Sequence, residues 1–310
     1  MEAAIEIKNV SKIFKQFPKK VTALSDINLV IKKGDIFGFL GPNGAGKTTL
    51  IKIIIGMLHP NAGEVNIMGI PAKEKSAKLK MGYLPERPYY HDFLTGQEFL
   101  EFHGALLSMT SAQLEKRIPE VLEMVGLSKG RNQNLREFSK GMLQRIGLAQ
   151  ALLHDPDVLV LDEPMSGLDP IGRKEVRDLI RRVAASGKTV FFSTHIVGDV
   201  EVICSNVGFI NQGKLTSIEN LNEALNRSIK SFEIKFTATD AAIEALQKKY
   251  DIHKVFDGWI FEINAEKSAQ EDLEKKINHV IKEIYSEKGV LKSVTPRKGN
   301  LEELYFEVSK

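Results

Sequence analysis

The sequence has a single cysteine, a single tryptophan and no long apolar run. The lone thiol of Cys204 excludes an internal disulfide, and 310 residues are enough to bury hydrophobic cores without disulfides or metals. The richest apolar run, Leu50 to Leu58, is interrupted by Lys52 and Gly56, so no membrane-spanning helix is expected. The first residues, MEAAIEIKNV, lack the cationic start and apolar stretch of a secretory signal. We therefore expect a protein that works in a reducing cytoplasm.

Charge of one sign is also lacking. The 43 Lys and Arg residues nearly balance the 40 Asp and Glu residues, which leaves a net charge of +3. From Ser228 to Lys310 there are 14 basic and 15 acidic residues, and the remainder holds 29 and 25. A nucleic-acid-binding domain would be strongly basic, so we expect no nucleic-acid partner. The length suggests about two domains.

Strands alternate with helices over the first two thirds of the chain, a pattern typical of a mostly parallel sheet. The residues between 95 and 125 carry apolar side chains at three- and four-residue spacing, which predicts a helical block. We expect strands at 5–7, 26–31, 36–40, 158–161 and 189–193, and helices at 47–58, 141–154 and 173–185.

The pattern changes near residue 228. We expect strand 231–237, helix 241–250, strands 252–256 and 259–263, helix 269–286 and strand 290–296. The order β-α-β-β-α-β is that of a ferredoxin-like unit. The sequence therefore predicts a first domain at 1–228 with an α/β fold and a small α+β, ferredoxin-like domain at 229–310. We expect the second domain to serve in dimerisation or regulation.

A glycine-rich loop is the strongest motif. Residues 41–48, GPNGAGKT, match G-x-x-x-x-G-K-[ST] between an expected strand and an expected helix. Glycines allow successive backbone N–H groups to converge on phosphates, and the helix dipole adds positive charge. Lys47 supplies a cation for the β- and γ-phosphates, and Thr48 a hydroxyl for Mg²⁺. The fold predicted for the first domain is that of a P-loop NTPase that binds ATP and Mg²⁺.

Two acidic residues end the buried strand at 158–161. Phosphoryl transfer needs a carboxylate that holds Mg²⁺ and a group that orients or deprotonates the attacking water. Asp162 fits the first role and Glu163 the second. Acidic residues commonly end strands, so this pair alone is weak evidence. Together with the upstream phosphate loop, it becomes strong evidence for a phosphoryl-transfer site.

Three further segments resemble motifs of the ATP-binding cassette (ABC) ATPases. Residues 138–145, FSKGMLQR, are similar to the signature motif, residues 166–169, SGLD, to the D-loop, and residues 193–195, STH, to the segment that carries the switch histidine. Phe14 lies where the family has an adenine-stacking aromatic. The motifs stand in the family order over residues 5 to 215, with a helical subdomain expected at about 87–155.

The resemblance implies a nucleotide site shared by two copies of the chain, closing on ATP and opening after hydrolysis. Ser139 and Gly141 of one copy would face the nucleotide held by the phosphate loop of the other, and His195 would sense the γ-phosphate and position water and Glu163. Taken alone, Ser139 is better explained as an ordinary helix cap. The nucleotide-binding residues implied are Phe14, Gly41, Asn43, Gly44, Gly46, Lys47, Thr48, Thr49, Ser139, Gly141 and Asp169.

Two departures from the family pattern matter. Glu86 stands where the family has a glutamine that contacts Mg²⁺, so Thr48, Asp162 and Glu86 are the expected metal ligands. Lys140 and Met142 replace a glycine and a glutamine of the signature. Both variants resemble the export branch, whose ATPases pair with a separate membrane permease. That branch often has a C-terminal extension ending in a motif like residues 300–306, NLEELYF.

The expected function is therefore that of an ATP-hydrolysing subunit, a homodimer on the cytoplasmic face of the membrane that powers a permease. The aromatic segment at 88–93 is either the permease-binding surface or a packed turn. A soluble ABC ATPase acting on the ribosome or DNA is the leading alternative, although one motif set and one cysteine count against it. A small-molecule P-loop kinase would leave the signature segment unexplained.

Overall fold

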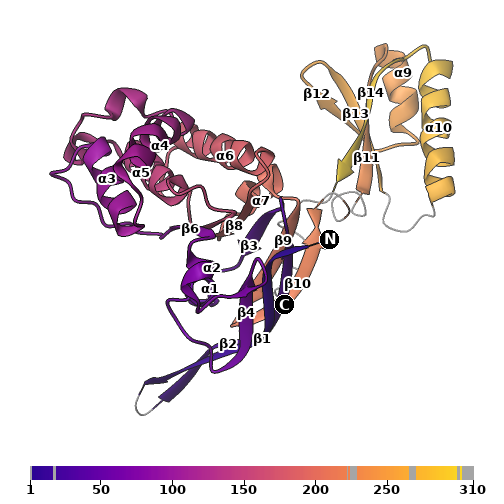
Figure 1. Cartoon of the computed structure of the whole chain (residues 1–310). Coiled ribbons are helices and arrows are strands. Elements are labelled where there is room, and N and C mark those ends of the chain that lie inside the picture. Colours follow the sequence, from indigo (N-terminus) through magenta and orange to yellow (C-terminus); the bar gives the residue numbers. More distant parts are fainter. Residues whose placement is uncertain are drawn as a thin grey trace. The chain divides into compact units, whose positions relative to one another are not determined.

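The computed structural model of the chain describes residues 2–16, 19–221, 223, 229–264, 270–298 and 301 (Figure 1). The described residues up to Leu221 form one compact unit, and those from Ile229 to Lys298 form a second. In these described ranges no helix is both long and apolar enough to cross a membrane. The C-terminal residues 302–310, and with them most of the NLEELYF motif, lie outside the described ranges.

A six-stranded sheet with the order β10-β9-β3-β8-β7-β6 carries the first unit. All neighbouring pairs are parallel except β10 and β9. Every residue of β3, β7 and β8 is buried, as expected for strands covered on both faces. The strands are β3 (Ile36–Leu40), β6 (Met81–Leu84), β7 (Val158–Asp162), β8 (Thr189–Thr194), β9 (Asn206–Asn211) and β10 (Lys214–Asn220).

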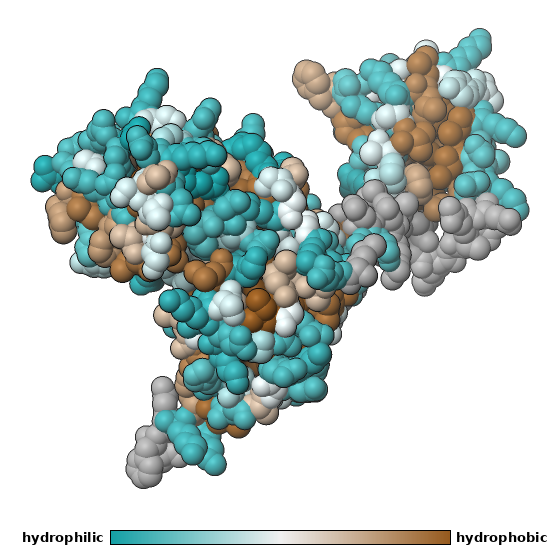
Figure 2. Space-filling view, viewed as in Figure 1, coloured by the Kyte–Doolittle hydropathy of each residue, from teal (hydrophilic) through white to brown (hydrophobic). Residues whose placement is uncertain are grey.

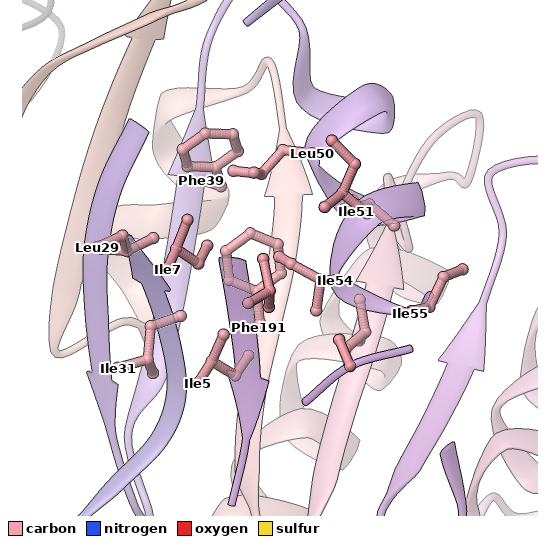
Figure 3. Close-up of a cluster of buried hydrophobic side chains, with 14 of the residues drawn as sticks. Ile5, Ile7, Leu29, Ile31, Phe39, Leu50, Ile51, Ile54, Ile55 and Phe191 are labelled. Atoms are coloured by element: carbon pink, nitrogen blue, oxygen red, sulfur yellow. The ribbon is translucent and has the colours of Figure 1, made fainter. Parts of the chain in front are cut away.

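A second, antiparallel sheet has the order β2-β1-β4-β5. Its apolar side chains, such as Ile7 and Leu29, pack with Phe191 of the parallel sheet and with Leu50 and Ile54 of α1 (Figure 3). This core fixes the helix that follows the phosphate loop against both sheets. The strands are β1 (Ala3–Gln16), β2 (Lys19–Lys32), β4 (Ala62–Ile67) and β5 (Ile70–Pro71).

The helices of the first unit begin at recognisable caps. The side chains of Thr95 and Thr110 each accept the N–H three residues later in a capping box. Ser139 and Asp169 cap α5 and α6. The helices are α1 (Lys47–Ile54), α2 (Lys75–Lys78), α3 (Gly96–Leu106), α4 (Ser111–Met124), α5 (Lys140–Leu152), α6 (Pro170–Ala185) and α7 (Val197–Ile203), with short 3-10 turns at Ser128–Gly130 and Leu135–Glu137.

The second unit has a four-stranded antiparallel sheet with the order β12-β13-β11-β14. Figure 2 shows hydrophobic side chains of this unit in a band beside α10, flanked by hydrophilic ones; its buried core includes Ile234, Phe236 and Ile284. The elements are β11 (Ile229–Thr237), α9 (Asp240–Gln247), β12 (Ile252–Val255), β13 (Gly258–Asn264), α10 (Gln270–Ser286) and β14 (Val290–Lys298). The element order is the predicted β-α-β-β-α-β.

The fold class predicted from the sequence is confirmed, and several element bounds differ from the predicted ones. The helix expected to reach Leu58 ends at Ile54, because Gly56 adopts a left-handed φ of 68° and turns the chain. The helical block at 95–125 is divided at Ser108, which has a φ of 60°. The first two strands are 14 residues each. They are longer than predicted because they continue into an exposed hairpin, where the sequence has no alternation of apolar and polar residues to indicate a strand.

Candidate functional site

The phosphate loop joins buried strand β3 to α1 through two closely packed glycines. A Cβ on Gly41 would lie 2.4 Å from the backbone oxygen of Ile210, and one on Gly46 would lie 2.6 Å from that of Ala23. Gly46 also has a φ of 108°, a conformation that side-chain-bearing residues rarely adopt. Both positions therefore require glycine.

Lys47, the first residue of α1, is buried beneath this loop with 6% of its surface exposed. Its Nζ donates to the backbone oxygens of Gly41 at 2.7 Å and Pro42 at 3.2 Å. The same nitrogen lies 3.3 Å from Oε1 of Glu163. The loop and the carboxylate together hold the ammonium group at the base of the site.

An open pocket of about 460 Å³ lies over the loop. This volume is within the range of ligand-binding clefts. Its lining comes from five separate parts of the chain, three of which contribute most of the predicted residues. The lining residues are Val21, Thr22, Ala23, Asn43, Gly44, Gly46, Lys47, Thr48, Thr49, Glu86, Glu163, Gln212 and Gly213.

Phe14 is not among the lining residues. It pairs across the β1–β2 hairpin with Val21, which does line the pocket, and 36% of its surface is exposed. The ammonium group of Lys12 lies 5.3 Å from the centre of its ring. The predicted stacking residue is therefore on the strand next to the pocket wall.

Asp162 ends β7 and is almost completely buried, with 1% exposure. Burial raises the pKa of Asp162 above its ordinary value of 3.8, and the nearby carboxylates of Glu163 and Glu86 raise it further. Hydrogen bonds from the hydroxyls of Ser193, at 2.6 Å, and Thr48 act in the opposite direction. These carboxylate and hydroxyl oxygens are the hard donors that Mg²⁺ prefers, and a divalent cation would offset the repulsion among the carboxylates.

Glu163 follows directly and is held in a different way. Its backbone has a φ of 50°, an uncommon conformation for a residue with a side chain. Its N–H donates to Oγ of Ser193 at 3.0 Å. Its Oε2 lies 2.9 Å from Nδ1 of His195, and its Oε1 faces Lys47. Backbone and side chain are therefore both fixed, with the carboxylate directed into the pocket.

The signature and D-loop residues lie outside this pocket. Ser139 is exposed and accepts the N–H of Met142 at 3.2 Å, and Gly141 follows in the first turn of α5. Asp169 is exposed and accepts the N–H of Gly172 at 2.8 Å. The structure of one chain thus places Ser139 and Asp169 as helix caps, the role that each has independently of a nucleotide.

Sequence reasoning missed three features of the site. The hydroxyl of Ser193 bridges Asp162 and the N–H of Glu163, although only its place in a motif had been noted. Gln144 of α5 donates to the backbone oxygen of Pro164 at 2.7 Å and so fixes the residue after Glu163. The Gln212–Gly213 turn lines the pocket, and the N–H of Gly213 donates to the backbone oxygen of Ala45. The glycine at 213 was the available signal for that turn.

The raised pKa of Asp162 gives a stability prediction. The folded protein retains this proton to a higher pH than the unfolded chain does, so this group lowers the free energy of unfolding as the pH rises from its ordinary pKa through the raised one. Asp162→Asn removes the buried charge and keeps an acceptor for Ser193. In urea titrations without nucleotide, the stability of this variant relative to the unsubstituted protein should increase as the pH rises above about 4. A pH-independent difference would contradict the assignment, and Asp157→Asn at an exposed ion pair is the control.

Comparison with known proteins gives the family. Residues 24–166 match the family described as ABC transporter. An ABC transporter ATP-binding protein of Nostoc sp. is 46% identical over 209 residues, 67% of this chain and 62% of that protein. The chain therefore spans less than two thirds of that relative's length. The bacitracin transport ATP-binding protein BcrA of Bacillus licheniformis is 37% identical over 234 residues, 74% of this chain and 76% of BcrA.

Among solved structures, the ATP-binding cassette MJ0796, in a dimeric post-hydrolysis state bound to ADP and Pi, is 27% identical. The match has a TM-score of 0.64 and covers 70% of this chain and 98% of that one. The coverage of these matches and the geometry of the pocket both support the same family. The chain belongs to the family of ABC transporter ATP-binding proteins.

Proposed function

We propose that this chain is the ATP-binding and ATP-hydrolysing subunit of an ABC transporter for export. In this proposal, ATP-driven closure of two copies of the chain powers a separate membrane permease. The observation that carries the proposal is that Lys47 and Glu163 line one pocket and contact each other. Asp162 is hydrogen-bonded to Thr48 of the same lining, and His195 lies 2.9 Å from Glu163. BcrA, a protein named for bacitracin transport, supports a transport role.

The phosphate loop binds the triphosphate of ATP in this proposal. The start of α1 would offer backbone N–H groups and the positive end of the helix dipole to the phosphates. Lys47 already faces one carboxylate and two backbone oxygens, and its ammonium group is close enough to the pocket to contact the β- and γ-phosphates. Asn43, Gly44 and Thr49 complete the cradle.

Thr48 and Asp162 would hold Mg²⁺, with Glu86 at the pocket wall as a further oxygen ligand. When bound, the ion neutralises charge on the phosphate oxygens. Ser193 orients Asp162 for this role, because its hydroxyl donates to Oδ1 of the carboxylate at 2.6 Å.

Glu163 acts as the general base in this mechanism. It accepts a proton from the water that attacks the γ-phosphorus; an O–P bond forms from water while the bond to the β-phosphate oxygen breaks, giving ADP and phosphate. Lys47 stabilises the negative charge that moves toward the leaving oxygens. His195 holds Glu163 through Nδ1 and, with 41% of its side chain exposed, also reaches the solvent side of the site.

A second copy of the chain is the proposed partner at the nucleotide. Ser139, Gly141 and Asp169 are outside the pocket of their own chain, and two of them cap helices whose N-terminal ends favour anions. The dimeric cassette MJ0796 bound to ADP and Pi supports this arrangement.

Glu163→Gln tests the hydrolytic assignment. The substitution keeps the side-chain shape and removes the base, so kcat for phosphate release should fall about 100-fold or more while ATP binding remains. The ATP-bound dimer should accumulate and elute early in size-exclusion chromatography. Glu175→Gln, an exposed carboxylate on α6, is the matched control. Unchanged turnover in Glu163→Gln would remove Glu163 from the mechanism.

The permease is proposed to bind the aromatic segment after Glu86. Tyr89 and Phe93 are 83% and 69% exposed, whereas the hydroxyl of Tyr90 donates to the backbone oxygen of Leu143 at 2.6 Å. The segment is thus anchored by Tyr90 and presents its other rings outward, as a protein-binding surface does. Such a partner would keep the chain at the cytoplasmic face of the membrane.

Purification from detergent-solubilised membranes of the source cells tests this partnership. We expect the tagged chain to bring down a polytopic membrane protein, and the double substitution Tyr89→Ser and Phe93→Ser to reduce the recovery. Val290→Ser, at a residue 60% exposed in the second unit, is the control and should retain it. Recovery with ribosomes instead would support the soluble alternative.

A further inference from the structure

A buried carboxylate outside the nucleotide pocket lies between two helices. Asp199, in α7, has 2% of its surface exposed. Its Oδ2 accepts from Arg173 at 2.7 Å, and its Oδ1 accepts from Arg177 at 3.1 Å. Both arginines belong to α6 and are about a quarter exposed. The single carboxylate on α7 is therefore paired with two guanidinium groups on α6.

The carboxylate is close to His195 in sequence. Asp199 is four positions after His195, and α7 begins between them, at Val197. Between them, the N–H of Ile196 donates to the hydroxyl of Thr194 at 3.0 Å, which ties the start of α7 to the end of β8. A shift or rotation of α7 would therefore move His195 relative to Glu163, its partner at 2.9 Å.

The two arginines fix how α6 and α7 are aligned. Residues four apart on a helix share one face, so Arg173 and Arg177 lie on the same side of α6. Both can reach Asp199 in only one position of α6 relative to α7. Arg173 also belongs to the first turn of α6, because its N–H donates to the backbone oxygen of Asp169 at 2.9 Å. A buried ion pair contributes little net stability compared with apolar packing, and its attested use is to fix alignment.

We propose that Asp199, with Arg173 and Arg177, is a positioning group that holds His195 in contact with Glu163. It contacts neither the pocket nor the reacting atoms, and it acts through the placement of α7. This inference rests on the proposed role of His195 in ATP hydrolysis.

Asp199→Asn is the first test. It keeps the size of the side chain and removes the charge that both arginines need. We expect kcat for ATP hydrolysis to fall by up to about 100-fold, because a small displacement of a catalytic group has effects of this size. The Kd for ATP should change less than about threefold, since the phosphate loop is not involved. Asp178→Asn on α6, an exposed partner of Arg181, is the matched control and should leave both values unchanged.

Arg177→Gln is the milder variant, to be used if Asp199→Asn does not fold. It leaves Arg173 to neutralise the carboxylate while the alignment of α6 with α7 loses one of its two contacts. We expect the same result as for Asp199→Asn, which is a lower kcat with little change in the affinity for ATP. Unchanged kcat in the folded variant would overturn the proposal.

A double-mutant cycle with His195→Ala separates positioning from a general structural effect. If Asp199 acts through His195, adding Asp199→Asn or Arg177→Gln to His195→Ala should change the residual kcat less than about threefold. Multiplicative losses would overturn the inference and leave the role of His195 intact. Full activity in His195→Ala alone would instead remove the proposed role of His195, and the inference with it.

Discussion

The contact between Lys47 and Glu163 places an ammonium nitrogen 3.3 Å from a carboxylate oxygen, with each side chain less than a tenth exposed. A charge removed from water must be paired or hydrogen-bonded, and each neighbour of this pair meets that requirement. Backbone oxygens of the phosphate loop surround Lys47, and His195 contacts the other oxygen of Glu163. The phosphate loop, the backbone of Glu163 with its φ of 50° and the imidazole of His195 all meet at this contact.

Sheet topology creates this arrangement. In the parallel sheet, Leu40 is level with Thr194 and Asp162 with Ser193, so β3, β7 and β8 deliver their following residues to the same edge. Ligand sites in open α/β sheets lie beyond the carboxyl ends of the strands. Adjacent residues can then do different work. Asp162 is oriented by hydroxyls and is suited to a metal, whereas Glu163 is held by a lysine and a histidine and is suited to water.

The strands, the phosphate loop and the acidic pair could be predicted because each depends on local residue order. Apolar runs predicted β3, β7 and β8, and the spacing of Gly41, Gly46 and Lys47 predicted the loop. The hydroxyl bridge of Ser193 could not be predicted, because it depends on the register between β7 and β8. Asp199 and its two arginines are 22 and 26 residues apart in sequence, and only the packing of α6 on α7 brings them together. Local pattern identifies the elements of a site, while its supporting contacts come from tertiary structure.

The central claim is that the two adjacent carboxylates have separate tasks, metal binding for Asp162 and water activation for Glu163. Electron paramagnetic resonance titration of Mn²⁺, a stand-in for Mg²⁺, in the presence of ATP measures this directly. Asp162→Asn should weaken Mn²⁺ binding about tenfold or more, and Glu163→Gln should change it less than about threefold. An equal loss in both variants would contradict the division of roles.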